Sequence, residues 1–159
     1  MISREMIIQT TEKWIENHGL RTASKDIQRP WGAFWHIRPD DTALFLKLFF
    51  PEYALSSTKS SLISPKILLV LPGQRLSLQL HHRRAECWTV LQGPVRIVLG
   101  DQEHTVYSPK QVTIPVDTPH RLVGLEKPGL VSEIWIHEDP ENPSTEEDIE
   151  RLEDDYQRK

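Results

Sequence analysis

Four side chains in this sequence have the chemical types and the spacing of a metal site. Gln79 and His81 lie two residues apart, and Glu86 follows after a short segment that can turn the chain. Residues two apart on a β-strand point to the same face, so Gln79 and His81 are expected to face one cavity. A later block, residues 114–122, contains two prolines and would turn His120 back into that cavity.

Two imidazoles, one carboxylate and one amide oxygen can hold a divalent transition metal and leave a coordination position open. The glutamine oxygen is neutral, so the set carries one formal negative charge and the bound ion stays electrophilic. Zinc suits these donors best, but manganese, nickel, cobalt and iron fit them too. The predicted cofactor is therefore a divalent metal, with zinc as the first expectation.

Positive side chains near these ligands indicate an anionic substrate. Arg84 and Arg121 are close to ligands in the sequence, and Arg75 has the strand parity of Gln79 and His81. The planar guanidinium of arginine binds phosphate through paired N–H donors. We therefore expect a phosphorylated small molecule as the partner, although each arginine could instead form a surface ion pair.

Most of the chain has the pattern of short β-strands. From Trp31 to about Ile136, apolar runs alternate with Pro, Gly and Asp, which indicates a β-sandwich or barrel. Trp88 shares the strand parity of Glu86, so it is expected to line the cavity or to join the core. The expected strands are residues 33–38, 43–50, 66–71, 76–81, 86–91, 94–99, 104–106, 111–114, 120–124 and 130–137.

A helix is expected on each side of the strands. Residues 4–18 carry apolar side chains at helical spacing, and Gly19 can end the helix. Residues 144–158 read as a second helix, because Ser144 and Glu147 fit a capping box and acidic residues crowd its first turn.

The chain is expected to divide into an N-terminal helical extension (1–28), a β-barrel (29–140) and a C-terminal helix packed on the barrel (141–159). Residues 51–65 are rich in Ser, lack periodicity and are expected to form a surface loop.

Composition narrows the class of protein further. A length of 159 residues is enough for one domain with its own core. No apolar stretch reaches the ~18 residues of a membrane span, and the N-terminus lacks a signal-peptide pattern. The single cysteine, Cys87, excludes an internal disulfide and fits a reducing compartment. A net charge of -4 argues against nucleic acid, so we expect a cytoplasmic protein that binds neither nucleic acid nor membrane.

The candidate ligands also carry a resemblance to known proteins. Their spacing resembles the two sequence blocks of cupin barrels, with Gln79 in the place of a first histidine. The glycines, ligands and proline that carry this resemblance are Gly73, His81, Glu86, Gly93, Pro115 and His120. The phrases Leu-Ser-Leu-Gln-x-His-His-x-Arg-Ala-Glu-x-Trp and Pro-x-x-x-Pro-His-Arg-Leu are similar to the mannose-6-phosphate isomerase domain of type II phosphomannose isomerases. Residues 29–32 and 147–156 agree with the same domain.

This resemblance implies an all-β cupin barrel, also called a double-stranded β-helix or jelly roll. It also implies a metal-dependent aldose–ketose isomerase that interconverts mannose 6-phosphate and fructose 6-phosphate, or acts on a related sugar phosphate. The family domain usually ends bifunctional mannose-1-phosphate guanylyltransferases, and we expect this chain to act without the guanylyltransferase part. Homodimerisation is expected by the same analogy.

The resemblance also suggests roles for individual residues. Arg84 matches the family phrase Arg-Ala-Glu and is expected to be catalytic together with His137, which lies near the end of a strand that would line the cavity. Lys66 corresponds to a family lysine that leads into a barrel strand. The expected substrate-binding residues are Arg75, Arg121, Lys66 and Trp88.

Departures from the family pattern keep two other functions open. The family often has a glutamate in an Ile-Glu-Val-Gln phrase, which we align with Ile134-Trp135-Ile136-His137, so no proton-transferring base is identified. Cys87 stands where the family usually has histidine. These changes favour a non-catalytic cupin that binds metal and sugar. A cupin oxygenase is the third alternative, and Gln79 counts against it because oxygenases usually have more histidine ligands.

Overall fold

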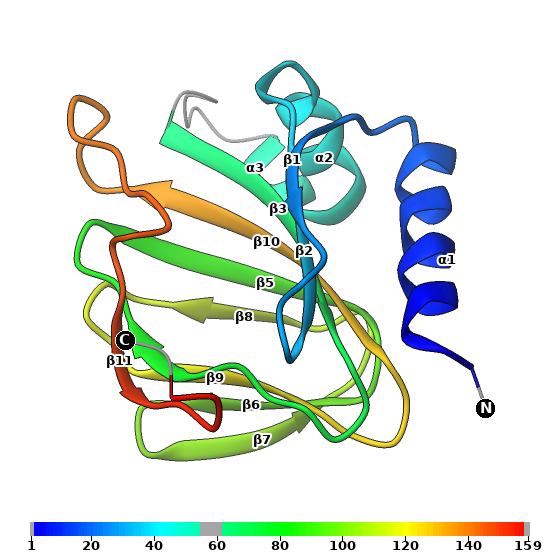
Figure 1. Cartoon of the computed structure of the whole chain (residues 1–159). Helices are drawn as coiled ribbons and strands as arrows, with labels where there is room; N and C mark the ends of the chain where they lie inside the picture. The colour runs from blue at the N-terminus through cyan, green and yellow to red at the C-terminus, as the bar shows by residue number, and fades with distance from the viewer. Residues whose placement is uncertain (1, 55–61, 158–159) are drawn as a thin grey trace.

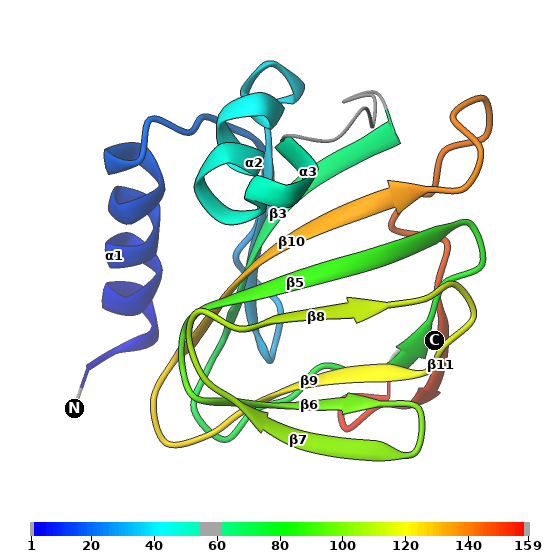
Figure 2. The same ribbon diagram turned by 180° about the vertical axis from the view of Figure 1, so that it is seen from behind.

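Two antiparallel β-sheets face each other in the computed structural model, which describes residues 2–54 and 62–157 (Figures 1 and 2). The larger sheet has the order β1 (Thr22–Asp26), β2 (Gly32–Ile37), β3 (Ile63–Val70), β10 (Gly129–His137), β5 (Arg84–Gln92) and β8 (Gln111–Ile114). The smaller sheet has the order β11 (Glu150–Glu153), β4 (Leu78–Leu80), β9 (His120–Gly124), β6 (Val95–Leu99) and β7 (Gln102–Val106).

Nine of the ten expected strands are present, and the exception is the segment 43–50. That segment is the helix α2 (Thr42–Phe49), which follows a short 3-10 turn (Pro39–Asp41) and precedes α3 (Pro51–Ala54). The prediction was wrong because a short, continuous apolar run does not distinguish a strand from a buried helix. The spacing of Phe45, Leu46 and Phe49 buries these side chains together against the larger sheet.

The N-terminal helix was predicted correctly and is α1 (Arg4–Asn17). Ser3 caps it by accepting a hydrogen bond from the backbone N–H of Met6, and Gly19, with φ of 77°, lets the chain leave the helix. The strand β1 was not predicted, because its residues are mostly polar and exposed at the sheet edge. Among the helices that the structure describes, none has both the length and the hydrophobicity needed to cross a bilayer.

The larger sheet is buried on both faces and separates two apolar clusters. Its outer face packs on α1 and α2, where Trp35 Nε1 donates a hydrogen bond to Glu12 Oε2 at 3.0 Å. Its inner face packs on the smaller sheet, and the largest inward side chains include Phe34, Leu68 and Trp88. Side chains alternate between these faces along β5, so Cys87 lies in the outer cluster while its neighbours point into the barrel.

The prediction of a C-terminal helix at 144–158 was wrong. After β10 the chain runs from the larger sheet to the smaller one across one end of the barrel, and residues 150–153 form β11 (Figure 1). β11 pairs with β4 at the edge of the smaller sheet. Ser144 and Glu147 favour a helix locally, but the pairing of β11 with β4 determines the structure here, because tertiary contacts routinely override weak helix preferences. Of the expected 51–65 loop, residues 51–54 are helical, 63–65 belong to β3, and the section 55–61 lies outside the described residues.

The carboxylate of Asp148 ties this C-terminal segment to the barrel. It accepts hydrogen bonds from the backbone N–H groups of His82 (2.9 Å) and Arg83 (3.0 Å) and from Ser144 Oγ (2.6 Å). Burial alone would raise the pKa of Asp148, but these hydrogen bonds lower it to about 2. Because the folded pKa lies below the ordinary one, Asp148 stabilises the fold fully above about pH 4 and loses this effect as the pH falls toward 2.

We expect the substitution Asp148→Asn to lower the free energy of unfolding by about 2 kcal/mol at pH 7. The difference from the wild type should shrink below about pH 4, where the wild-type carboxylate becomes protonated. Urea unfolding at a series of pH values measures both effects. Asp101→Asn, in the exposed turn between β6 and β7, is the control and should change little. An equal loss of stability at about pH 7 and pH 3 would contradict this account.

Candidate active site

A cluster of two histidines and one glutamate lies inside the barrel, near the end that the C-terminal segment crosses. His81, Glu86 and His120 each offer a donor atom, and these atoms lie within 4.8 Å of one another. His81 Nε2 is 3.4 Å from Glu86 Oε2, and His120 Nε2 is 3.2 Å from Glu86 Oε1. All three side chains are buried. The strands bring them together because Glu86 lies on β5 of one sheet and His120 on β9 of the other.

The backbone orients both imidazoles for metal binding. His81 Nδ1 is 2.7 Å from the carbonyl oxygen of Asp148, and His120 Nδ1 is 2.9 Å from that of Thr118. A carbonyl oxygen only accepts, so each Nδ1 must carry the proton. In the neutral tautomer each Nε2 then presents its lone pair toward Glu86.

These donors fit a divalent cation. The atoms Glu86 Oε1 and His120 Nε2 are buried, and neither has a hydrogen-bond partner among the described residues. Two such acceptors facing each other require a cation or a proton between them. Burial lowers the pKa of His81 to about 4, which keeps its ring neutral at neutral pH, and Nε2 then accepts a hydrogen bond from Arg84 Nη2 at 3.2 Å. Burial also opposes the charged form of His120, but the negative charge of Glu86, 3.2 Å away, outweighs it and raises the pKa of His120.

Gln79 lies beside this cluster, as expected from its position two residues before His81. It pairs with His120 across β4 and β9, which puts both side chains on the inner face of the smaller sheet. Its Nε2 atom is 3.3 Å from His81 Nε2, while its Oε1 atom accepts a hydrogen bond from Ser77 Oγ at 2.7 Å. Gln79 would therefore supply an oxygen ligand only after its amide group rotates by half a turn.

Arg84 connects the cluster to the C-terminal segment. Its Nε atom donates to Glu86 Oε2 at 2.8 Å, and its Nη1 atom donates to Ser144 Oγ at 2.9 Å. Its guanidinium also stacks on the ring of Trp135, 3.6 Å from the ring centroid. Burial alone would raise the pKa of Glu86, but the charge of Arg84 and contact with both histidines hold that pKa well below its usual range.

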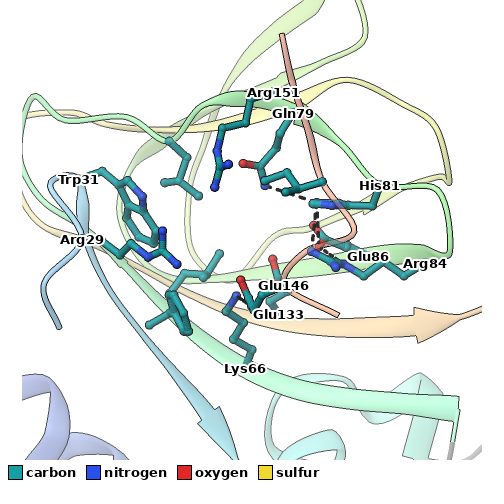
Figure 3. A pocket seen from close by; sticks show the side chains of 14 residues that line it. Arg29, Trp31, Lys66, Gln79, His81, Arg84, Glu86, Glu133, Glu146 and Arg151 are labelled. Atoms are coloured by element: carbon teal, nitrogen blue, oxygen red, sulfur yellow. Dashed lines mark hydrogen bonds and ion pairs between the residues drawn. The ribbon is translucent and has the colours of Figure 1, made fainter. Parts of the chain in front are cut away.

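The cluster opens into a small pocket with a volume of about 40 Å³ (Figure 3). Its polar lining consists of Arg29, Lys66, Gln79, His81, Arg84, Glu86, Glu133, Glu146 and Arg151. Trp31, Phe34, Leu68, Leu76 and Ile149 supply the apolar part. Such a volume has room for only a few water molecules, so a larger ligand must displace part of this lining.

Glu133 is a functional candidate that the sequence analysis missed. It lies on β10, is 3% exposed and accepts hydrogen bonds from the indole N–H groups of Trp88 (2.6 Å) and Trp135 (2.7 Å). Burial and, next, the charge of Glu86 raise the pKa of Glu133 to about 7. A carboxyl group with such a pKa can both accept and return a proton near neutral pH.

The available signal for Glu133 was its place as an acidic residue inside an apolar strand. The alignment with the family phrase puts the family glutamate at Trp135, which lies two residues later in the chain. Residues two apart on a strand share a face, so Glu133 and Trp135 both point into the barrel. The alternation pattern therefore does not indicate which of the two positions corresponds to the family glutamate.

The structure brings several of the other predicted residues to this site. Lys66 lines the pocket and contacts Glu146, with Nζ 2.6 Å from Oε1. Trp88 lies behind the pocket, where it donates to Glu133 and its ring is edge-on to that of His120 at 5.6 Å. His82 faces outward as expected and contacts Asp117.

Five of the predicted site residues are not among the described residues that line the pocket. His120 belongs to the metal cluster and Trp88 lies behind the pocket, whereas three others belong to neither place. Arg75 is at the surface and pairs with Asp155 at 2.7 Å. Arg121 follows His120 on its strand and therefore points to the opposite face, where its Nε atom donates to the carbonyl oxygen of Leu76.

The third of these residues is His137, whose ring contacts β3 and the C-terminal segment beside the pocket. Its Nε2 atom is 2.8 Å from Ser64 Oγ, and its Nδ1 atom accepts a hydrogen bond from the backbone N–H of Ser144. Both ring nitrogens are thus engaged with other parts of the protein. His137 positions the C-terminal segment and does not reach the pocket.

Comparisons with known proteins find one family that matches most of this chain. The family described as Mannose-6-phosphate isomerase C-terminal matches residues 52–154. The alginate biosynthesis protein AlgA of Pseudomonas aeruginosa is 39% identical over 93 residues, which are 58% of this chain and 19% of that protein. Mannose-1-phosphate guanylyltransferase 2 of Escherichia coli O157:H7 is 27% identical over 161 residues, covering 98% of this chain and 29% of that protein. The chain thus spans less than a third of the length of these curated relatives.

Solved structures show the fold. A cupin 2 conserved barrel domain protein from Salinispora arenicola matches with a TM-score of 0.52 and 14% identity, covering 73% of this chain and 83% of that one. A cupin-2 domain protein from Rhodospirillum rubrum matches with a TM-score of 0.51 and 18% identity, covering 82% of this chain and 78% of that one. The prediction of a cupin barrel is confirmed.

Proposed function

The chain belongs to the mannose-6-phosphate isomerase C-terminal family, and we propose that it is a metal-dependent isomerase of mannose 6-phosphate and fructose 6-phosphate, or of a related sugar phosphate. The observation that carries this proposal is the pairing of two features in one pocket. A buried carboxyl group with a pKa near neutrality, Glu133, shares the pocket with the cluster that contains His81 and Glu86.

The cluster would hold the metal through His81, Glu86 and His120, with Gln79 as a fourth ligand once its amide rotates. A divalent ion bound there supplies a Lewis acid that favours negative charge on the sugar oxygens. We propose zinc as the ion, since two imidazoles and a carboxylate are common zinc ligands, and manganese, nickel, cobalt and iron remain alternatives.

Glu133 would transfer the proton. Its ionised carboxylate removes the proton from C2 of open-chain mannose 6-phosphate, and the C–H electron pair forms the C1–C2 double bond of a cis-enediol. The protonated carboxyl group then returns the proton to C1, while a hydroxyl proton moves from O2 to O1. Arg84 lies beside Glu86 and adds positive charge near the developing oxyanion.

A coupled assay tests the proposed activity. Metal-loaded protein should form fructose 6-phosphate from mannose 6-phosphate, and removal of the metal with a chelator should abolish turnover until zinc or another divalent ion is restored. Mannose without the phosphate serves as the control substrate and should react poorly. Tight binding of mannose 6-phosphate without turnover would instead support a non-catalytic metal- and sugar-binding cupin.

A further inference from the structure

Positive side chains other than Arg84 also line the pocket, and one of them, Arg29, lies at the end away from the metal cluster (Figure 3). Figure 3 shows Arg29 and Trp31 at the opposite end from His81 and Arg84, with Arg151 between them. An open-chain hexose 6-phosphate has the same polarity, because its reacting carbons and its phosphate lie at opposite ends. With the reacting carbons of such a ligand at the metal cluster, its phosphate would extend past Lys66 and Arg151 toward Arg29.

Three elements that are distant in sequence supply the positive side chains. Arg151 pairs with Gln79 across β11 and β4, so both side chains lie on the inner face of the smaller sheet. Lys66 is on β3 of the larger sheet and lies against the ring of Phe34, 4.0 Å from the ring centroid. Arg29 approaches the same ring, with Cζ 5.4 Å from its centroid.

The N-terminal helix fixes the loop that presents Arg29. Arg4 Nη2 lies within hydrogen-bond distance of the carbonyl oxygens of Ile27 (2.8 Å), Arg29 (2.8 Å) and Gly32 (2.7 Å). The Nε atom of Arg29 also contacts Asp26 at 2.9 Å. The guanidinium of Arg29 is thus held at the pocket before any ligand arrives, which reduces the entropy lost on binding.

The protein already places an anion of its own against Lys66, between the two ends of the pocket (Figure 3). Glu146 Oε1 contacts Lys66 Nζ at 2.6 Å and His36 Nε2 at 3.1 Å. Burial alone would raise the pKa of Glu146, but His36 and Lys66 lower it below its usual range. Negative charge is therefore favoured at this position. The side chain of Glu146 is 38% exposed, so it can turn into the solvent and release Lys66.

We propose that Arg29, Lys66 and Arg151 form the subsite for the phosphate group of the substrate, and that phosphate displaces the Glu146 carboxylate from Lys66. The inference rests on the proposed function for the choice of a hexose 6-phosphate as the ligand. It also accounts for the small pocket, since departure of Glu146 enlarges the space where the phosphate binds.

Calorimetric titration with inorganic phosphate tests this subsite without any turnover. A chelator keeps the protein metal-free, so that phosphate bound to a metal does not contribute. Arg151→Gln and Arg29→Gln should each weaken phosphate binding by at least about tenfold, because each loses a charge-assisted hydrogen bond. Glu146→Gln should strengthen binding by about tenfold, because the competing negative charge is gone.

Two surface substitutions serve as matched controls. Arg75→Gln removes a positive charge outside the pocket, and Glu141→Gln removes an exposed negative charge from the same C-terminal segment. Both should leave phosphate binding unchanged, and circular dichroism should show that every variant is folded. Absence of phosphate binding in the wild type, or a Glu146→Gln variant that binds no more tightly, would overturn the proposal.

Failure of this inference can be told apart from failure of the proposed function. If Arg151→Gln isomerises mannose 6-phosphate with an unchanged KM, the proposed phosphate subsite is wrong and the proposed isomerase activity is supported. If phosphate binding follows the predicted pattern but the protein has no isomerase activity, the subsite is supported and the proposed activity is wrong.

Discussion

Replacing Glu86 by glutamine is expected to weaken metal binding by at least about a hundredfold and to abolish measurable isomerisation of mannose 6-phosphate. Glu86 is the only carboxylate in the His–Glu–His cluster, and its two oxygens face His81 and His120. The neutral amide removes the negative charge that attracts a divalent ion. Metal content after dialysis and the coupled assay measure the two effects.

Stability has to be measured in the same experiment, because Glu86→Gln leaves the buried guanidinium of Arg84 without its charge partner. A second variant, His120→Asn, removes a ligand and keeps the pair between Glu86 and Arg84. Glu103→Gln on the exposed strand β7 is the control and should bind metal normally. A folded Glu86→Gln protein that retains one equivalent of metal would show that the cluster is not the metal site.

The sequence was sufficient to find this cluster because its spacing follows strand geometry. Alternation put Gln79 and His81 on one face, and a turn brought Glu86 back beside them on the next strand. His120 joined them through pairing between β4 and β9, which the proline-containing turn before it indicated. The same alternation rule excluded His82, which lies at the surface.

Residues that enter the pocket through long-range pairing were harder to predict. Arg151 reaches the pocket only because β11 adds to the edge of the smaller sheet, and its local sequence favours a helix. Glu146 precedes that strand and contacts Lys66, eighty positions earlier in the chain. Composition and periodicity describe neighbours in sequence, so they contain little information about such contacts.

The same limit applied to the choice of arginines. Arg75 and Arg121 are near the ligands in sequence, yet one faces the solvent and the other faces away from the barrel interior. Arg29 was not predicted to bind substrate, since residues 29–32 only supported the family resemblance, yet it lines the pocket. Proximity to the ligand motif thus predicted that positive side chains line the pocket, but it did not predict which arginines these are.

The proton-transferring role of Glu133 makes a prediction about the pH dependence of the reaction. Proton removal requires the ionised carboxylate, so kcat/KM should fall as the pH drops below the pKa of Glu133, which burial and the charge of Glu86 raise to about 7. A bound metal ion adds positive charge and would move this limb to lower pH. Trp135 Nε1 donates a hydrogen bond that lowers the pKa of Glu133, so Trp135→Phe should move the limb to higher pH.

Replacing Glu133 by glutamine is expected to lower kcat by about a hundredfold to ten-thousandfold, because the amide does not accept the C2 proton. Metal content should stay normal, since Glu133 is not one of the three clustered donors. Exchange of the C2 proton of mannose 6-phosphate with deuterated solvent, followed by NMR, reports proton removal directly and should also disappear. Glu138→Gln, an exposed substitution just after the same strand, is the control. Glutamine keeps the shape of the glutamate side chain and removes only its ability to accept a proton. Normal exchange in a metal-loaded Glu133→Gln protein would therefore mean that a different group removes the C2 proton.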